Sequence, residues 1–177
     1  MSRGIAKWPR WVRWTLEGAV ALGVVWAIQA WQARDVPAVA PAFSGPAAPE
    51  GGLSLEGWRA RYPGRPVALY FWAEWCPVCS LQQDSVGRLR ADWPVLTIAM
   101  QSGDAGAVAR TLRARGLDWP TVVDADGSIA ARYGLRGVPA LVVVDAGGRI
   151  RSVAAGYSPE PALRARLWWA DRFGGAD

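Results

Sequence analysis

Histidine is absent from this 177-residue chain, and cysteine occurs only twice, as Cys76 and Cys79. The lack of histidine excludes Ser-His and Cys-His catalysis and every histidine-ligated metal site. A structural zinc site built from cysteine and histidine would need more such ligands than these two residues. Because Ser80 follows Cys79, the C-x-x-C-H signature of covalent haem attachment is also missing. We therefore expect neither a bound metal ion nor a cofactor.

Positive charge is concentrated near the N-terminus. The formal net charge is +5, and the domain beyond residue 34 contains no lysine. The charged residues of the first 34 positions are Arg3, Lys7, Arg10, Arg13 and Arg34, against Glu17. The rest of the chain is nearly neutral and lacks a basic stripe interleaved with aromatic residues. This distribution argues against nucleic-acid binding.

A mostly apolar run from Val12 to Trp31 predicts a membrane-spanning helix, which requires roughly 20 residues. Tryptophans at both ends resemble an aromatic belt, and the positive residues lie mainly before the run. We expect residues 1–34 to form a cytoplasmic tail and an uncleaved transmembrane anchor. A cleaved signal peptide is the alternative, because Ala38-Val39-Ala40 resembles a cleavage site, but Pro41 would follow the cut.

Proline, alanine and glycine dominate residues 35–52, which predicts an extended linker. Residues 53–177 are expected to form one folded domain without internal repeats. Its hydrophobic pattern predicts strands at 67–71, 95–100, 121–123, 141–144 and 150–155. Helices are expected at 55–62, 76–91, 105–115, 128–133 and 159–172, the last capped by Ser158. The alternation indicates an α/β fold, and the closing hairpin indicates a mixed sheet.

The segment Cys76-Pro77-Val78-Cys79 lies where a buried strand is expected to end and a helix to begin. Unpaired N–H groups and the helix dipole favour a thiolate at that position. Cys79 returns to the same side of the helix one turn later, so the pair can close a disulfide reversibly. We expect Cys76 to be the exposed attacking thiol and Cys79 the buried resolving thiol. A static disulfide is the alternative, although so short a loop would stabilise the fold weakly.

Two neighbours complete this candidate site. Trp75 is expected to shield the thiol and to offer an apolar platform for a protein partner. Pro77 fits an early helical position, where its missing N–H costs little.

Three separated motifs resemble the thioredoxin-like family. Trp72 to Cys79 looks like the pattern W-A-x-W-C-x-x-C, and Gly137-Val138-Pro139 resembles the cis-proline loop opposite it. The stretches Trp119–Gly127 and Val144–Ile150 are similar to the membrane-anchored TlpA/ResA/ScsD-like thioredoxins of bacteria. The resemblance implies a thioredoxin-like mixed central sheet flanked by helices, with a cis Pro139 against the disulfide. It also implies that the Val138 backbone pairs with a substrate polypeptide by strand addition.

This resemblance includes one departure. Tyr70 stands where thioredoxins often carry a buried acid that helps to deprotonate the resolving thiol.

The resulting hypothesis is a thiol-disulfide oxidoreductase that spans the bacterial inner membrane once, with its catalytic domain in the periplasm. Its expected partners are proteins with thiols or disulfides and a membrane electron donor or acceptor of the thiol-disulfide exchange type. The reductase direction is slightly favoured because Pro77-Val78 contains no ionisable group, and it would suit cytochrome c maturation or disulfide repair.

Three other activities are alternatives to this hypothesis. One is an oxidase of substrate thiols, and another is a tethered module that holds Cu(I) on the two thiolates. The resembled family also contains members linked to copper tolerance, but the strand-to-helix placement of the cysteines and the Pro139 loop disfavour the Cu(I) module. A peroxidase is disfavoured, because Trp75 occupies the position where a threonine is expected.

Overall fold

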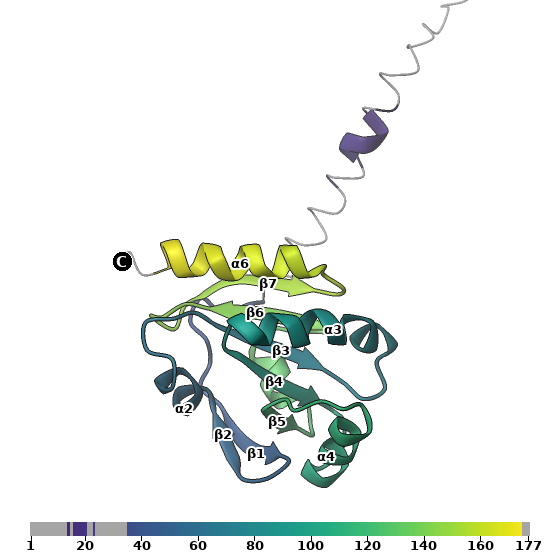
Figure 1. Cartoon of the computed structure of the whole chain (residues 1–177). Coiled ribbons are helices and arrows are strands. Elements are labelled where there is room, and N and C mark those ends of the chain that lie inside the picture. The colour runs from purple at the N-terminus through teal and green to yellow at the C-terminus, as the bar shows by residue number, and fades with distance from the viewer. Residues whose placement is uncertain (1–13, 15, 21–22, 24–34, 175–177) are drawn as a thin grey trace, which may run out of the picture. The chain divides into compact units, whose positions relative to one another are not determined.

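The computed structural model describes residues 14, 16–20, 23 and 35–174 (Figure 1). The chain divides into two units, Met1–Arg34 and Asp35–Asp177, and the second is the folded domain. The anchor expected between Val12 and Trp31 lies mostly outside the described residues. Among the residues that are described, no helix has the length and apolarity needed to cross a bilayer.

The domain is built on one seven-stranded mixed sheet with the order β2-β1-β5-β4-β3-β6-β7. Its strands are β1 Ser44–Ala48, β2 Gly52–Ser54, β3 Val67–Trp72, β4 Val95–Met100, β5 Thr121–Asp124, β6 Ala140–Val144 and β7 Ile150–Ala155. Its helices are α2 Leu55–Ala60, α3 Pro77–Asp92, α4 Ala105–Ala114, α5 Ser128–Arg132 and α6 Glu160–Phe173. Strands β3, β4 and β5 are parallel, whereas β6 runs antiparallel to β3 and β1 runs antiparallel to β5.

Alternating side chains of the central strands form two cores, one on each face of the sheet. Tyr70 and Trp72 of β3 point into a core shared with buried residues of α3, α4 and α6. Leu69 and Phe71, which alternate with them, point into the opposite core beneath α2 and α5. All six residues of β3 are buried. A strand covered on both faces explains the continuous apolar run in the sequence.

The element predictions for residues 53–174 are confirmed with boundary shifts of one or two residues, and so is the mixed sheet. The cap predicted for the last helix is wrong. Pro159, not Ser158, is the residue that precedes α6, and no side chain caps this end. The amide of Ser158 instead donates to Oε1 of Gln82 in α3, at 3.2 Å.

The segment predicted as a linker contains part of the sheet. Within residues 35–52, β1 pairs with β5 through Ala47 and Ala48 and joins β2 to the sheet. Gly45 fits closely here, because a Cβ atom on it would lie 3.1 Å from Cγ1 of Val122. Small residues in this stretch therefore permit close packing, and the expectation of an extended linker is wrong for residues 44–52.

Residues 35–43, called the strap below, lie along the domain before β1. The Tyr133 hydroxyl donates to the carbonyl oxygen of Pro41 at 2.8 Å. The Ala40 amide donates to the carbonyl oxygen of Gly148 at 2.9 Å, in the β6–β7 turn. At its other end, Asp35 forms an ion pair with Arg136, two residues before Val138. The strap is thus fixed to the loop that leads into β6.

Candidate active site

The two cysteines lie at the start of α3, just past the end of β3. Cys76 is the residue that caps the helix, with an extended backbone (φ −92°, ψ 109°), and Pro77 is the first helical residue. The Cys79 amide donates to Sγ of Cys76 at 3.2 Å. Sulfur therefore takes the role that a side-chain oxygen plays at an ordinary helix start. This contact confirms the prediction that the first thiol meets unpaired N–H groups at a helix N-terminus.

The loop before β6 forms the opposite wall of the site. The register that pairs Phe71 with Ala140 places the start of β6 beside the end of β3. The Val138–Pro139 peptide bond is cis, as the family resemblance implies. Sγ of Cys76 donates to the carbonyl oxygen of Val138 at 3.5 Å. Cys76, Cys79, Val138 and Pro139, predicted from separate motifs, are brought together.

Cys76 is less accessible than the sequence suggested. Only 4% of this residue is exposed, and 3% of Cys79. The Cys76 sulfur is enclosed because it points toward the Val138 carbonyl and accepts from the Cys79 amide. The expectation of an exposed attacking thiol is therefore wrong for this dithiol form, in which both cysteines are free.

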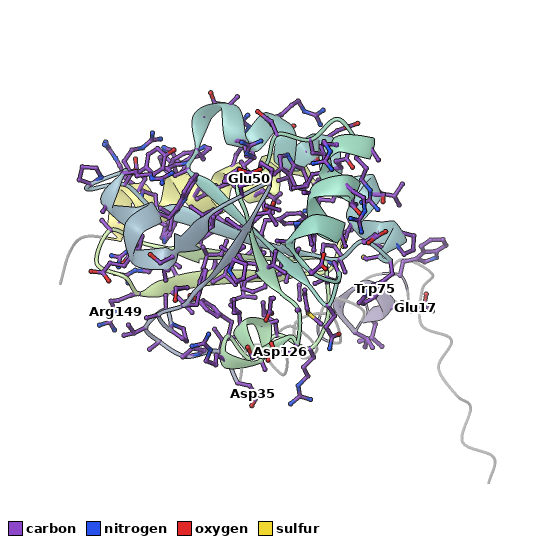
Figure 2. All side chains as sticks on the ribbon, turned by 90° about the horizontal axis from the view of Figure 1, so that it is seen from below. Glu17, Asp35, Glu50, Trp75, Asp126 and Arg149 are labelled. Carbon is purple, nitrogen blue, oxygen red and sulfur yellow. The ribbon has the colours of Figure 1, made fainter. Side chains whose placement is uncertain are left out.

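Trp75 supplies the apolar surface beside the covered thiol. It is 59% exposed and projects from the edge of the domain (Figure 2). Its Nε1 donates to the carbonyl oxygen of Gln101 at 3.1 Å, which fixes the indole without burying it. Pro77 is also exposed at the surface. Both lie where a partner polypeptide could reach them next to Cys76.

Residues 73–76, called the cysteine loop below, are held by Gln101, Ser102 and Arg115. The sequence interpretation did not include these three residues. The Glu74 amide donates to Oγ of Ser102 at 3.0 Å, and Gln101 accepts from Trp75. Both follow β4, whose end lies beside the end of β3 because the two strands are parallel. The parallel pairing of these two strands could therefore have pointed to Gln101 and Ser102. Arg115 donates to the Glu74 carbonyl oxygen at 2.8 Å, from the end of α4, and no local pattern pointed to it.

The surroundings of Cys79 favour a neutral thiol. Burial and, next, hydrogen bonding with Cys76 raise the pKa of Cys79 well above its ordinary value. The Ala73 backbone and the positive charge of Arg115 act in the opposite direction. Arg115 also lies over the ring of Trp72, 5.8 Å from guanidinium carbon to ring centroid. The Cys79 thiol therefore lies between a desolvating core, which raises its pKa, and the positive charge of Arg115, which lowers it.

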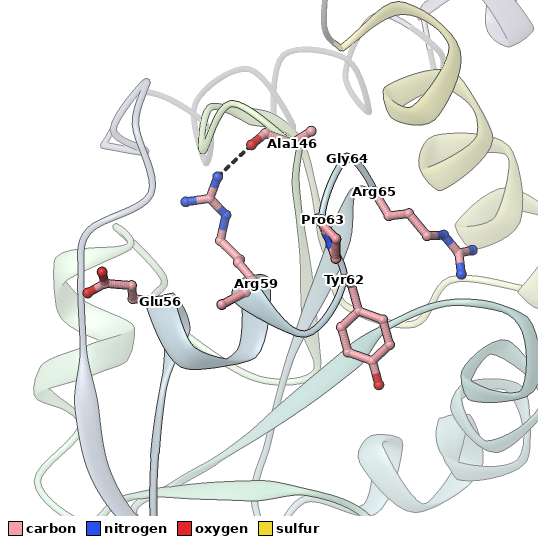
Figure 3. A pocket seen from close by; sticks show the side chains of 8 residues that line it. Glu56, Arg59, Tyr62, Pro63, Gly64, Arg65 and Ala146 are labelled. Carbon is pink, nitrogen blue, oxygen red and sulfur yellow. Dashed lines mark hydrogen bonds between the residues drawn. The ribbon is translucent and has the colours of Figure 1, made fainter.

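A hollow at the other end of the sheet is unrelated to the thiols. It has a volume of about 270 Å³ and lies between α2 and the β6–β7 turn, where Arg59 donates to the carbonyl oxygen of Ala146 at 2.7 Å (Figure 3). Val67 and Val144, which pair at this end, mark the start of β3, whereas the cysteines follow its end. Within the described residues, no group of three or more His, Cys, Asp or Glu side chains could hold a metal ion.

Solved structures share this architecture. A secreted disulfide oxidoreductase of Mycobacterium tuberculosis, described as homologous to DsbE of Escherichia coli, superimposes with a TM-score of 0.56 and 28% identity. The match covers 71% of this chain and 94% of that one. A mixed sheet with helices on both faces and a cysteine pair facing a cis-proline loop places the protein in the thioredoxin-like fold class.

The family follows from the sequence match. Residues 36–167 match the Redoxin family model, and the chain belongs to that family. A thioredoxin-like protein of Haemophilus influenzae is 29% identical over 111 residues, which cover 62% of this chain and 66% of that protein. The thiol-disulfide oxidoreductase ResA of Geobacillus thermodenitrificans is 27% identical over 131 residues, which cover 70% of this chain and 75% of that protein. The chain thus spans just under two thirds of the Haemophilus relative.

Proposed function

We propose that this protein is a thiol-disulfide oxidoreductase that exchanges electrons with protein disulfides through Cys76 and Cys79. The observation that carries the proposal is the contact set at Cys76, whose sulfur accepts from the Cys79 amide and lies against the Val138 carbonyl. The first contact stabilises negative charge on the attacking sulfur. The second brings that sulfur next to the backbone with which an extended substrate would pair.

In the reductase direction, the Cys76 thiolate attacks a substrate disulfide. A bond forms between Cys76 and one substrate sulfur, and the other substrate sulfur leaves as a thiolate that takes up a proton. Cys79, once deprotonated, attacks Cys76, and the second substrate thiolate leaves. The dithiol loses two electrons and the substrate disulfide gains them. Trp75 and Pro77, exposed beside Cys76, would contact the partner polypeptide.

The proposed location is the bacterial inner membrane, with residues 1–34 as a single-pass anchor and the domain in the periplasm. The apolar run between Val12 and Trp31 and the preceding basic residues support this location. The expected partners are proteins with thiols or disulfides and a membrane protein that exchanges electrons by the same chemistry. The similarity to a secreted homologue of DsbE supports a role outside the cytoplasm.

The reductase direction is the favoured one. The dipeptide Pro77-Val78 adds no charged or hydrogen-bonding side chain that would stabilise the Cys76 thiolate further. Less thiolate stabilisation corresponds to a less oxidising disulfide, which suits reduction in cytochrome c maturation or disulfide repair.

Insulin reduction by the full chain tests the proposal, with dithiothreitol as the electron donor. We expect turnover by the wild-type protein and none above background by Cys76→Ser, because serine cannot form the mixed disulfide. Cys79→Ser should instead accumulate a covalent adduct with insulin. Undiminished activity of Cys76→Ser would refute the proposal. Tight Cu(I) uptake by the reduced protein without thiol exchange would support the copper-holding role in its place.

A further inference from the structure

Tyr70 has a buried hydroxyl group that the mechanism above does not use. Its side chain is 0% exposed and belongs to the same core cluster as Cys76 and Cys79. Among the described residues, its hydroxyl oxygen makes no hydrogen bond of ordinary length and angle. Buried polar groups are normally paired, because leaving one unpaired costs free energy. An unpaired hydroxyl behind a reactive cysteine pair therefore suggests a partner that forms during the reaction.

The packing around Tyr70 leaves little choice of partner. Its ring meets Trp119 edge to face, with centroids 5.8 Å apart, and Trp119 packs in the same way on Trp72 at 6.0 Å. The rings of Trp119 and Trp72 carry no oxygen or sulfur atom that could accept a hydrogen bond from the hydroxyl. The pKa of Tyr70 is raised mainly by burial, next by the charges of Cys79 and then Cys76, and next by hydrogen bonding with Cys79, whereas the charge of Arg115 lowers it. Cys79 is thus the nearby group whose charge matters most to this hydroxyl.

Tyr70 remains protonated during catalysis, because its raised pKa lies far above neutral pH. It cannot act as the base that a buried carboxylate would provide at this position. A phenol O–H is nevertheless a good donor to an anionic sulfur, and such charge-assisted bonds are stronger than neutral ones.

We infer that Tyr70 donates a hydrogen bond to Sγ of Cys79 whenever that sulfur is anionic, and so stabilises Cys79 both as attacking group and as leaving group. The inference rests on the proposed oxidoreductase function and adds a catalytic residue to it. The Ala73 backbone and Arg115 favour the same anion, whereas burial and the Cys76 sulfur oppose it.

The role is the same in both directions of electron flow. When an external thiolate opens the Cys76–Cys79 disulfide, it bonds to Cys76, and the electron pair of the broken S–S bond moves to Cys79. In the reverse step, the Cys79 thiolate attacks Cys76 and expels the partner thiolate. The Tyr70 proton stays on oxygen in both cases, so the hydroxyl stabilises charge without transferring a proton.

The test is Tyr70→Phe in the full chain, which removes only the hydroxyl. We expect resolution of a pre-formed mixed disulfide to slow roughly 10- to 100-fold, the effect of one hydrogen bond to a charged group. The first attack, measured as adduct formation in the Cys79→Ser background, should be unchanged by Tyr70→Phe. Tyr133→Phe is the control, because Tyr133 is equally buried but lies in the opposite core, where its hydroxyl bonds Pro41; this loss should leave resolution unchanged.

A second readout is independent of turnover. In the Cys76→Ser background, the pKa of Cys79 measured from thiolate absorbance should be higher with Tyr70→Phe than with Tyr70. Wild-type resolution rates together with an unchanged Cys79 pKa would overturn the inference and leave the oxidoreductase function intact. If Cys79→Ser formed no adduct at all, the proposed function itself would fail, so the two failures are distinguishable.

Discussion

Cys76 and Cys79 are three residues apart, yet their sulfur atoms have different surroundings. Sγ of Cys76 accepts from the Cys79 amide and donates to the Val138 carbonyl oxygen, whereas Cys79 lies within the first turn of α3. Burial raises the pKa of Cys79, so in the reduced protein its thiol stays neutral well above its ordinary range. This difference supports the proposed roles, with Cys76 as the attacking thiol and Cys79 as the resolving thiol.

The raised pKa of Cys79 predicts how the stability of the reduced protein depends on pH. An unfolded thiol ionises near pH 8.5, whereas the folded one retains its proton, so Cys79 stabilises the fold fully only below that pH. As pH rises past 8.5, the free energy of unfolding should fall by up to about 1.4 kcal/mol per pH unit from this group.

Urea unfolding under reducing conditions at pH 8 and pH 9.5 measures this loss. Tyr70 and Tyr133 also have raised pKa values, but unfolded tyrosine ionises near pH 10, so their contribution begins above this window. We expect a smaller loss in Cys79→Ala than in the wild type. Equal losses in the two proteins would contradict the assignment.

At the scale of elements, composition misrepresented the strap of residues 35–43 as well as β1, which follows it. Its prolines and alanines are typical of linkers, but here hydrogen bonds at Ala40 and Pro41 hold the strap to the domain. The strap passes Gly134, whose φ of +68° and close approach to Asp35 exclude a side chain. Such tertiary contacts leave no periodic pattern in the sequence.

Gly134→Ala tests whether the strap is part of the fold. A Cβ atom there would lie 2.3 Å from the Asp35 carbonyl oxygen, in addition to the strain of a positive φ. Gly64→Ala is the matched control, with φ +74° and nothing within 4 Å. We expect the control to lose about 1 kcal/mol of unfolding free energy and Gly134→Ala at least about 1 kcal/mol more.

Hydrogen exchange at Ala40 gives a local readout of the same contact. Its amide donates to the Gly148 carbonyl oxygen, so it should exchange faster in Gly134→Ala than in Gly64→Ala. Equal exchange and equal stability in the two variants would show that the strap does not hold the domain.

The other elements could be predicted because their residues follow local rules. The continuous apolar runs of β3 and β4 and the early Pro77 of α3 depend only on neighbours in the chain. The cysteine pair and Pro139 belong to recognisable motifs. The hydrogen bond of Arg115 to Glu74 and the shared core of Tyr70 and the two cysteines depend on strand register and helix packing, which one sequence does not specify. The enclosure of Cys76 by Val138 was missed for the same reason.

At the scale of the whole molecule, the sheet topology assembles the site from distant segments. The parallel strands β3 and β4 end on the same side of the sheet, and the antiparallel strand β6 begins on that side. This side gathers the cysteine loop, Gln101, Ser102 and the Val138–Pro139 loop, and α4 ends with Arg115 beside them. The hollow near Arg59 lies at the opposite ends of these strands, away from the cysteines.

The central claim is that Cys76 and Cys79 form a reversible redox couple, and a redox titration of the full chain tests it most directly. The protein is equilibrated in glutathione buffers of graded potential and trapped with a thiol-alkylating reagent, and its mass is measured. The account predicts one two-electron transition between dithiol and intramolecular disulfide, near the thioredoxin value of about −270 mV. A protein that forms no Cys76–Cys79 disulfide at any potential, or only glutathione adducts, would contradict the account.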